Sequence, residues 1–230
     1  MIVDVIIPAY NEEQSIKNVL IDIPKDIVRE IIVINNNSND NTELVACQNG
    51  AKVISEYKKG YGWACLKGID YLNSKDNKPD IVVFLDADYS DYPEQIKELV
   101  HPIIYEKKDL VIGSRVLGKV EKNSMPLQQR FGNWIATRLI RLFYGVSYTD
   151  LGPFRAILFN KLLAIDMKDK TYGWTVEMQL KAVKNKFRVL EIPVNYRKRI
   201  GVSKISGTLK GTILAGYKII STIFKYSFIK

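Results

Sequence analysis

Short, strongly apolar segments recur along the first half of the chain and constrain its fold more than any other feature. They are VDVIIPAY at residues 3–10, EIIVI at 30–34, AKVISE at 51–56, DIVVFLD at 80–86 and DLVIGSR at 109–115. Most of them are apolar at consecutive positions rather than at every second one, which is typical of strands buried on both faces. We therefore predict an α/β fold with a mostly parallel sheet.

Segments with apolar residues at helical spacing separate these strands. We expect helices at 12–22, 40–48, 60–72 and 92–103, so that helices cover both faces of the predicted sheet. After residue 116 the regular alternation ends. The remaining expected elements are a loop to Pro126, a helix that ends at Tyr144, an apolar segment at 153–159, a helix at 174–184 and a strand at 187–194.

Positive charge is concentrated near the C-terminus. The chain has a net charge of +9, and residues 181–230 hold twelve Lys or Arg residues with a single acid. We predict a domain at 1–205 and a basic amphipathic helix at 206–230. Two interpretations of this helix are compatible with each other: it lies on an anionic membrane, or it packs its apolar face on the domain and leaves its lysines in solvent. Its two faces hold Leu209, Ile213, Ile220 and Phe224 on one side and Lys204, Lys218 and Lys225 on the other.

Composition excludes several classes of protein. With 47% hydrophobic residues among 230, the chain can bury a sizeable core. Cys47 and Cys65 have no metal-ligand spacing and do not make a disulfide framework, which favours a cytoplasmic location. We expect no signal peptide and, because no apolar run reaches about 18 residues, no membrane-spanning segment. Nucleic acid is not an expected partner, since the basic residues lack interleaved aromatics.

Polar motifs follow four of the predicted strands. PAYNEE comes after the first strand, NNNSNDNT (35–42) after the second, DADYSD (86–91) after the fourth and GSR (113–115) after the fifth. Ligands bind at the carboxyl ends of the strands in open α/β sheets. We therefore expect these motifs to form one binding site.

The motif DADYSD indicates a metal site. Asp86 and Asp88 stand two residues apart at a strand end, so they face the same way if the chain stays extended. Two converging carboxylates repel each other unless a cation lies between them or one of them is protonated. Carboxylate oxygens suit Mg²⁺ or Mn²⁺, which also bind substrate phosphates. The alternative is a solvated acidic loop.

Arginines are the second group that suits a phosphate ligand, because guanidinium groups bind phosphate in a bidentate manner. Arg115 directly follows a strand end. Other arginines lie in segments that can fold back over the site, namely Arg130, Arg155, Arg197 and Arg199. The alternative for each of them is a solvated basic surface.

Taken in order, the motifs resemble those of a known enzyme family. They are IIPAYNEE, NNNSNDNT, GYGWACLKG, DADYSDYPE, GSR, TDLGPFRA and RIGVSK. This set, from about residue 2 to 206, is similar to family 2 glycosyltransferases of the GT-A fold, and within them to polyprenyl-phosphate sugar synthases such as dolichyl-phosphate mannose synthase and dolichyl-phosphate glucosyltransferase. The resemblance implies a peripheral enzyme at the cytoplasmic face of the membrane. Its reaction is an inverting, metal-dependent transfer of a hexose from a UDP-glucose or GDP-mannose type donor to a polyprenyl phosphate.

The resemblance also implies roles for individual residues. The nucleotide-binding residues would be Pro8, Tyr10, Glu12, Asn35, Asn36 and Asp86, with Asp86 and Asp88 as ligands of Mg²⁺ or Mn²⁺. The acceptor-binding residues would be Ser114, Arg115, Arg130, Arg199 and Lys204, and the catalytic set Asp88, Arg115 and Arg130. A lipid phosphate is largely ionised at neutral pH and needs no strong general base.

Two departures and two rival functions remain beside this interpretation. The family usually has Asp-Asp-Gly-Ser-x-Asp-Gly-Thr in place of NNNSNDNT. Asn35 and Asn36 thus replace two carboxylates with amides, which favours uracil over guanine as the base of the donor. The polyprenyl branch often has Gln and His where Ser90 and Asp91 stand.

The first rival function is transfer to a sugar hydroxyl, which would need a carboxylate as general base. The candidates for this base are Asp150 and Glu177. The alternative for Glu177 is an acid on a helix surface. The second rival is a nucleotide-sugar-binding protein without activity.

Overall fold

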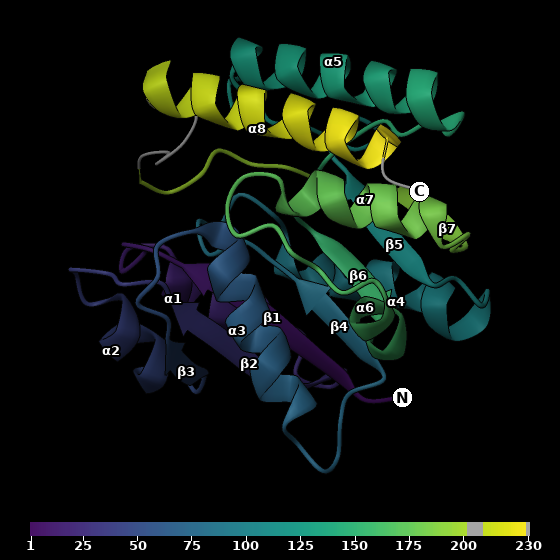
Figure 1. Ribbon diagram of the computed structural model, residues 1–230. Helices are drawn as coiled ribbons and strands as arrows, with labels where there is room; N and C mark the ends of the chain where they lie inside the picture. The colour runs from purple at the N-terminus through teal and green to yellow at the C-terminus, as the bar shows by residue number, and fades with distance from the viewer. Residues whose placement is uncertain (202–208, 229–230) are drawn as a thin grey trace.

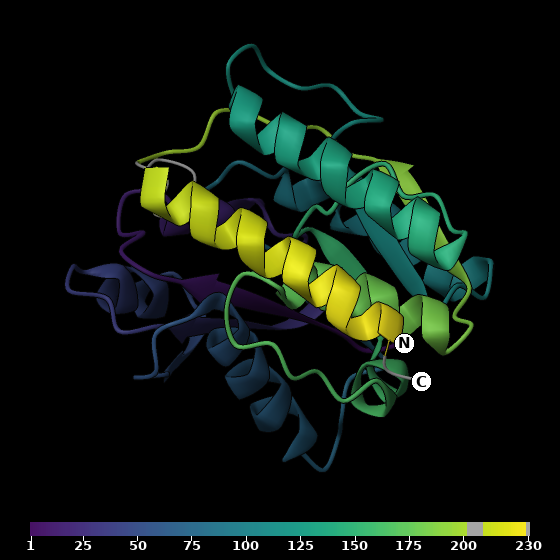
Figure 2. The same cartoon turned by 45° about the horizontal axis from the view of Figure 1, so that its top comes forward.

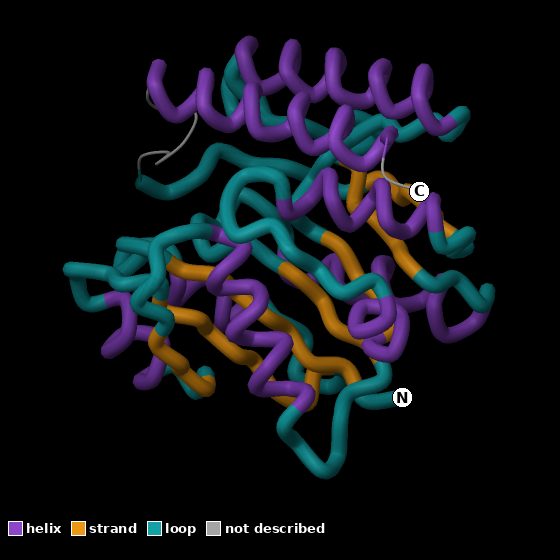
Figure 3. Tube along the Cα trace, in the orientation of Figure 1, coloured by secondary structure: helices purple, strands orange, loops and turns teal. Residues whose placement is uncertain are grey.

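The computed structural model describes residues 1–201 and 209–228, and its centre is a twisted sheet between layers of helices (Figure 1). The sheet has seven strands, which Figure 3 separates from the helices by colour. Six of them run in parallel, and only β6 runs antiparallel to its neighbours β4 and β5. In spatial order the strands are β3 (Lys52–Ser55), β2 (Val28–Asn35), β1 (Val3–Ala9), β4 (Ile81–Phe84), β6 (Arg155–Leu158), β5 (Leu110–Ser114) and β7 (Val189–Pro193).

Helices cover both faces of the sheet. One face packs against α1 (Ile16–Asp22), α2 (Thr42–Gln48) and α4 (Ile96–Tyr105), the last of which follows a 3₁₀ turn at Pro93–Gln95. The other face packs against α3 (Tyr61–Asn73), α5 (Leu127–Tyr144), the short α6 (Phe159–Ala164), α7 (Trp174–Lys184) and α8 (Leu209–Phe228). Both faces of each central strand are therefore apolar, which explains the uninterrupted runs in the sequence.

Strand β1 shows how the two cores are divided. Val5 and Ile7 belong to the core under α1, α2 and α4, whereas Ile6 between them belongs to the core under α3. Helix α3 approaches β1 closely because it carries Gly68 at the crossing. A Cβ atom at Gly68 would lie 2.8 Å from a methyl carbon of Ile6, so a larger residue would push the helix away from the sheet.

The predicted α/β fold with a mostly parallel sheet is confirmed, and the differences are local. The expected helix at 12–22 begins only at Ile16, because the chain first turns so that the amides of Ser15 and Ile16 donate to the carbonyl of Glu12. The apolar segment at 153–159 contains β6, whose antiparallel direction no sequence pattern indicated, and α6 was not expected.

Helix α8 lies beside α5 on the outer side of α7 (Figures 1 and 2). Its inward side chains include Thr222 and Ile223, while Ile213 is 61% exposed and Ile220 and Phe224 are also exposed. Helix α8 therefore does pack on the domain, and Lys225 stays exposed, but the packed face is not the one that Ile213, Ile220 and Phe224 define. Lys218 instead forms a 3.0 Å ion pair with Asp169.

Two parts of the C-terminal prediction lie outside the described residues. These are Lys204 and the proposed boundary between 205 and 206. Within the part of the chain that the structure describes, every helix is too short or too polar to cross a membrane.

Candidate active site

The polar motifs meet where β1, β2 and β4 end. Ala9 and Asn35 are paired across the last residues of β1 and β2. The loops that follow are joined by hydrogen bonds from the amides of Asn11, Glu12 and Glu13 to Ser38 Oγ (3.0 Å), Thr42 Oγ1 (2.8 Å) and Asp40 Oδ2 (3.2 Å). Residues 35–42 are thus an ordered wall against the loop after β1. A cavity of about 250 Å³ lies beside it, bordered by Glu12, Asp40 and Ile200 among others.

The amides of Asn35 and Asn36 hold the wall together. Asn36 Nδ2 donates to the carbonyls of Glu56 (3.0 Å) and Lys58 (2.8 Å), and its Oδ1 accepts from the amide of Gly60 (2.8 Å). Asn35 Nδ2 donates to Glu43 Oε2 at 2.7 Å. A carboxylate at position 36 has no N–H with which to make the first two bonds. The departure from the family pattern therefore has a structural reason, and contact of either amide with a base stays a prediction.

Asp86 and Asp88 follow β4 after one residue, Leu85. In the described part of the chain, Asp86 Oδ1 is buried and has no hydrogen-bond partner. Burial, and then the charge of Asp88, raise the pKa of Asp86 to about 7. Asp88 Oδ1 accepts a 2.9 Å hydrogen bond from the amide of Ser90, and Asp88 Oδ2 pairs with the guanidinium of Arg199. Arg199 therefore gives Asp88 a cationic partner, whereas Oδ1 of Asp86 has none among the described residues.

These two residues fit a hard divalent cation. Among the described residues, no group of three or more His, Cys, Asp or Glu side chains is placed to hold a metal ion. Mg²⁺, however, usually takes only one or two carboxylates and completes its shell with waters and substrate phosphates. Asp86 Oδ1, which has no hydrogen-bond partner among residues 1–201 and 209–228, suits such an ion beside a second carboxylate that already holds a cationic group.

Asp91 is a third carboxyl in the same loop, where the sequence shows only a departure from the branch pattern. Its side chain is almost fully buried, and both oxygens lack a hydrogen-bond partner in the described part of the structure. Burial, followed by the charges of Asp86 and Asp88, raises its pKa well above the ordinary value. Burial and the neighbouring carboxylates therefore favour the protonated form of Asp91.

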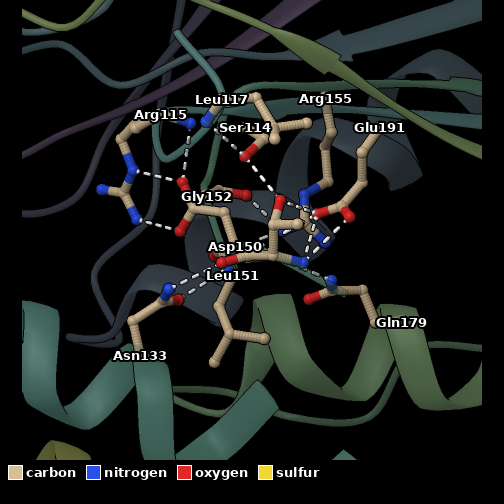
Figure 4. Close-up of polar contacts among 11 residues, drawn as sticks. Ser114, Arg115, Leu117, Asn133, Asp150, Leu151, Gly152, Arg155, Gln179 and Glu191 are labelled. Carbon is tan, nitrogen blue, oxygen red and sulfur yellow. Dashed lines mark hydrogen bonds and ion pairs between the residues drawn. The ribbon is translucent and has the colours of Figure 1, made fainter. Parts of the chain in front are cut away.

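Ser114 ends β5, Arg115 follows it, and both belong to a buried polar cluster (Figure 4). Arg115 donates from Nε to Asp150 Oδ2 at 2.7 Å and from Nη2 to Asp150 Oδ1 at 2.8 Å. Ser114 Oγ lies 2.7 Å from Thr149 Oγ1, and Glu191 accepts from the amides of Thr149 and Asp150. Asp150 is fully buried as the counter-ion of Arg115, so it has no exposed oxygen with which to act as a base.

Glu177 is neither a surface acid nor an accessible base. It is fully buried on α7 and accepts hydrogen bonds from the amides of Lys168 and Asp169 and from the hydroxyl of Tyr226, at 2.6 Å. It also pairs with Lys181 at 2.7 Å. The expectation of an exposed helix acid is wrong, because Glu177 joins the 168–169 loop to α7 and α8.

The other arginines differ in their surroundings. Arg130 is exposed on the first turn of α5. Arg197 lies between the rings of Tyr89 and Tyr92, at 3.5 and 4.1 Å from their centroids. Arg155 is fully buried beneath the site and donates to the carbonyls of Thr175 and Gly152, and burial lowers its pKa to about 10. Arg199 alone reaches Asp88.

The remaining predicted residues line the β1 side of the site. Pro8 is half-buried in β1, Glu12 is buried and accepts from Ser15 Oγ at 2.8 Å, and the ammonium of Lys59 lies 5.6 Å from the ring centroid of Tyr10. The structure therefore brings Glu12, Asp86, Asp88 and Arg199 to one edge of the sheet. It places Ser114 and Arg115 in the adjoining buried cluster.

A comparison with known families agrees with this arrangement. The sequence model of the family described as Glycosyl transferase family 2 matches residues 4–165. This chain belongs to that family. The glycosyltransferase is 31% identical to an undecaprenyl-phosphate mannosyltransferase of Micrococcus luteus, over 90% of this chain and 88% of the relative. It is also 31% identical to a UDP-N-acetylglucosamine–dolichyl-phosphate N-acetylglucosaminyltransferase of Methanococcus voltae, over 82% of this chain and 83% of the relative.

Solved structures show the same fold. Glucosyl-3-phosphoglycerate synthase of Mycobacterium tuberculosis, in complex with Mn²⁺, UDP-glucose and phosphoglyceric acid, superposes with a TM-score of 0.78. The match covers 100% of the glycosyltransferase and 80% of the solved chain, at 22% sequence identity. The GT-A fold that the motifs implied is confirmed by this likeness and by the sheet itself.

Proposed function

We propose that this glycosyltransferase transfers a hexose, with inversion, from a UDP-glucose or GDP-mannose type donor to a polyprenyl phosphate. The observation that carries the proposal is the pair of carboxylates Asp86 and Asp88 after β4. Asp88 pairs with Arg199, and its carbonyl accepts from the amide of Ile200, which borders the cavity. Two relatives at 31% identity are named for transfer to undecaprenyl phosphate and dolichyl phosphate.

The chemistry follows from the residues of this chain. An oxygen of the acceptor phosphate attacks the anomeric carbon of the donor sugar, and the bond from that carbon to the nucleoside diphosphate breaks, so the diphosphate leaves with the electron pair. A Mg²⁺ or Mn²⁺ ion held by Asp86 and Asp88 would neutralise the charge that develops on the leaving group. Arg130 and Arg199 would bind the acceptor phosphate, because guanidinium groups match phosphate oxygens.

A phosphate acceptor suits the site better than a sugar hydroxyl. Transfer to a hydroxyl needs a base that removes its proton. The two candidates for this base, Asp150 and Glu177, are fully buried and have their oxygens engaged by Arg115, Tyr226 and main-chain amides. A polyprenyl phosphate removes the requirement, since its phosphate is already largely ionised at neutral pH.

An exposed apolar surface on α5 and α8 suits a lipid acceptor. We call it the α5/α8 surface. Phe143 of α5 and Phe224 of α8 pack edge to face across it, with ring centroids 5.1 Å apart. Its members are Leu127, Phe131, Trp134, Leu142 and Phe143 of α5 and Ile213, Leu214, Tyr217, Ile220 and Phe224 of α8, all exposed.

Charge on the same two helices favours an anionic membrane as the occupant of this surface. Neither helix contains Asp or Glu, whereas Arg130, Arg138, Arg141 and Lys225 are present. Aromatic and aliphatic side chains beside basic ones are typical of helices that lie in a membrane interface. The enzyme would thus bind peripherally, on the cytoplasmic face, where its lipid acceptor is held.

The reaction is tested with purified enzyme, a panel of UDP- and GDP-sugars, Mg²⁺ or Mn²⁺, and undecaprenyl or dolichyl phosphate. We expect a sugar–lipid product that disappears in Asp88→Ala. Transfer only to oligosaccharide would replace the proposal with the sugar-hydroxyl function. Binding of a nucleotide sugar without turnover on any acceptor would instead identify a binding protein.

A further inference from the structure

Asp88 already has a positively charged partner in this structure. The guanidinium of Arg199 pairs with Asp88 Oδ2, and the two side chains are 30% and 5% exposed. The other oxygen of Asp88 accepts hydrogen bonds from the amide and hydroxyl of Ser90. Asp88 Oδ2 is therefore the oxygen most readily offered to a metal ion, and it is the one that Arg199 occupies.

The main chain around Arg199 is fixed to the same loop. The amide of Ile200 donates to the carbonyl of Asp88 (3.0 Å), and the amide of Arg197 donates to the carbonyl of Ser90 (2.9 Å). Arg197 also donates from Nε to the carbonyl of Tyr89, at 2.9 Å, and lies between two tyrosine rings. Only the side chain of Arg199 has to rotate for its guanidinium to leave Asp88.

Two features make the pair exchangeable. Arg199 Nε is buried without a hydrogen-bond partner in the described part of the chain, so this guanidinium is less well satisfied than that of Arg115, which donates from two of its nitrogens to Asp150. A divalent ion held by Asp86 and Asp88 would carry twice the charge of the guanidinium and would repel a guanidinium that stayed on Asp88. It would also supply the partner that Asp86 Oδ1 lacks.

We propose that Arg199 is the resident counter-ion of Asp88 and that the metal ion displaces it, which frees the guanidinium for the phosphate of the acceptor. This inference rests on the proposed metal site and acceptor. It assigns one side chain to two anions in succession, first Asp88 and then the acceptor phosphate. The acceptor would therefore bind tightly only after metal and donor are in place.

The first test measures metal binding without donor or acceptor. Mn²⁺ is titrated into wild type, Arg199→Ala and Lys198→Ala, and free Mn²⁺ is followed by electron paramagnetic resonance. Removal of a charge-assisted bond to Asp88 is expected to tighten Mn²⁺ binding by about ten-fold in Arg199→Ala. Lys198→Ala, which removes the same charge from the adjacent exposed residue, controls for net charge and should change affinity little. Equal or weaker Mn²⁺ binding by Arg199→Ala would overturn the exchange.

Thermal unfolding checks that Arg199→Ala remains folded. Without metal this variant should melt below wild type, because Asp88 loses its cation, and Mn²⁺ should raise its melting temperature by more than it raises that of wild type. Arg199→Lys keeps the charge and should lie between the two in both measurements. An equal Mn²⁺-induced shift in all variants would contradict the proposal.

The second test concerns the acceptor side. The affinity of wild type for farnesyl phosphate is expected to rise when Mn²⁺ and UDP are present, and Arg199→Ala should lose most of that rise. A wild-type affinity that does not respond to Mn²⁺ and UDP would refute the second role of Arg199. The exchange at Asp88 and the proposed transfer reaction can fail separately. The Mn²⁺ titration tests the exchange without turnover, and the transfer assay does not depend on which group pairs with Asp88 before metal binds.

Discussion

Arg115 and Asp150 form a bidentate ion pair in which the side chains are 6% and 0% exposed. The pair joins the end of β5 to the segment that precedes β6, and Arg115 also stacks on Tyr196, 5.1 Å from its ring centroid. A buried charge of this kind is tolerated only because its partner is present. The family resemblance implies a catalytic role for Arg115. In that role Asp150 would orient the guanidinium of Arg115.

The first prediction concerns this pair. Asp150→Asn is expected to lower the free energy of unfolding by about 3–5 kcal/mol, because it leaves the guanidinium of Arg115 buried without a counter-ion. Urea unfolding followed by circular dichroism measures the change. Asp166→Asn removes an acid from an exposed pair with Lys168 and should have little effect. An equal loss of unfolding free energy in both variants would show that the buried pair contributes no more to stability than the exposed pair does.

Glu177 gives a second prediction, which separates a structural carboxylate from a base. Tyr226→Phe removes one hydrogen bond to Glu177 and should cost about 1.5–3 kcal/mol of stability, since the acceptor is charged. Its effect on kcat should be small. Steady-state kinetics and urea unfolding on the same preparation distinguish the two. A large fall in kcat without a loss of stability would restore Glu177 as a candidate for chemistry.

A third prediction follows from the pKa of Asp86, which burial and the charge of Asp88 raise to about 7. Between pH 4 and pH 7 the unfolded chain has released a proton that the folded protein still holds. The free energy of unfolding of the metal-free protein should therefore fall as the pH rises through this range, by the linkage between proton binding and stability. Asp86→Asn should flatten this slope, whereas Asp70→Asn, a change at an exposed position of α3, controls for the loss of one carboxyl group. Identical slopes in Asp86→Asn and wild type would contradict the assignment.

The α5/α8 surface gives a fourth prediction. The double variant Trp134→Ser/Tyr217→Ser should bind vesicles of phosphatidylcholine with phosphatidylglycerol more weakly than wild type does, because it removes two exposed aromatic side chains. Flotation of vesicles measures the bound fraction. Tyr57→Ser removes a side chain of similar exposure from the loop after β3 and should not change binding. Undiminished vesicle binding by the double variant would show that the protein contacts the membrane through another surface.

The fifth prediction tests the wall made by residues 35–42. Asn36→Asp restores a residue typical of the family, yet it should destabilise this chain by about 1–3 kcal/mol, because the carbonyls of Glu56 and Lys58 lose their donor and face a carboxylate. Asn37→Asp is a suitable control, since Asn37 has φ of 64° and Asp tolerates that conformation. Thermal melting compares the two. A more stable Asn36→Asp protein would disprove the structural reason given for the departure.

Local pattern was enough to predict most of the sheet but not its completion. Runs such as IVVF are apolar on both sides whatever their neighbours are, so the strands could be found one at a time. The direction of β6 depends on its pairing with β4 and β5, which are distant in the sequence. The local sequence of β6, RAIL, therefore does not predict this direction. Helix α8 was misjudged because a helix usually buries its most apolar face, whereas here Ile223 and Thr222 face inward and Ile213 does not.

The site was predictable to the same extent. The position of Asp86 and Asp88 after β4 could be predicted because a strand end places them, independently of the rest of the chain, and their role as metal ligands stays a prediction. The partners of Asp88, Asp150 and Glu177 come from distant segments, so periodicity and spacing could not reveal them. The sequence does contain one signal of such a contact. Glu191 is the only acid among residues 181–230, and its carboxylate accepts from the amides of Thr149 and Asp150.

The antiparallel strand β6 has a consequence for how the protein is made. β4 and β5 do not touch in this sheet; β6 lies between them, and the other neighbour of β5 is β7. While the chain leaves the ribosome, β5 therefore has no partner until residues 155–158 emerge, and β4 keeps an open edge for the same time. Open edges of apolar strands invite pairing with other chains. A nascent chain stalled before residue 155 should thus be a substrate for chaperones, although two-thirds of the protein has already been synthesised.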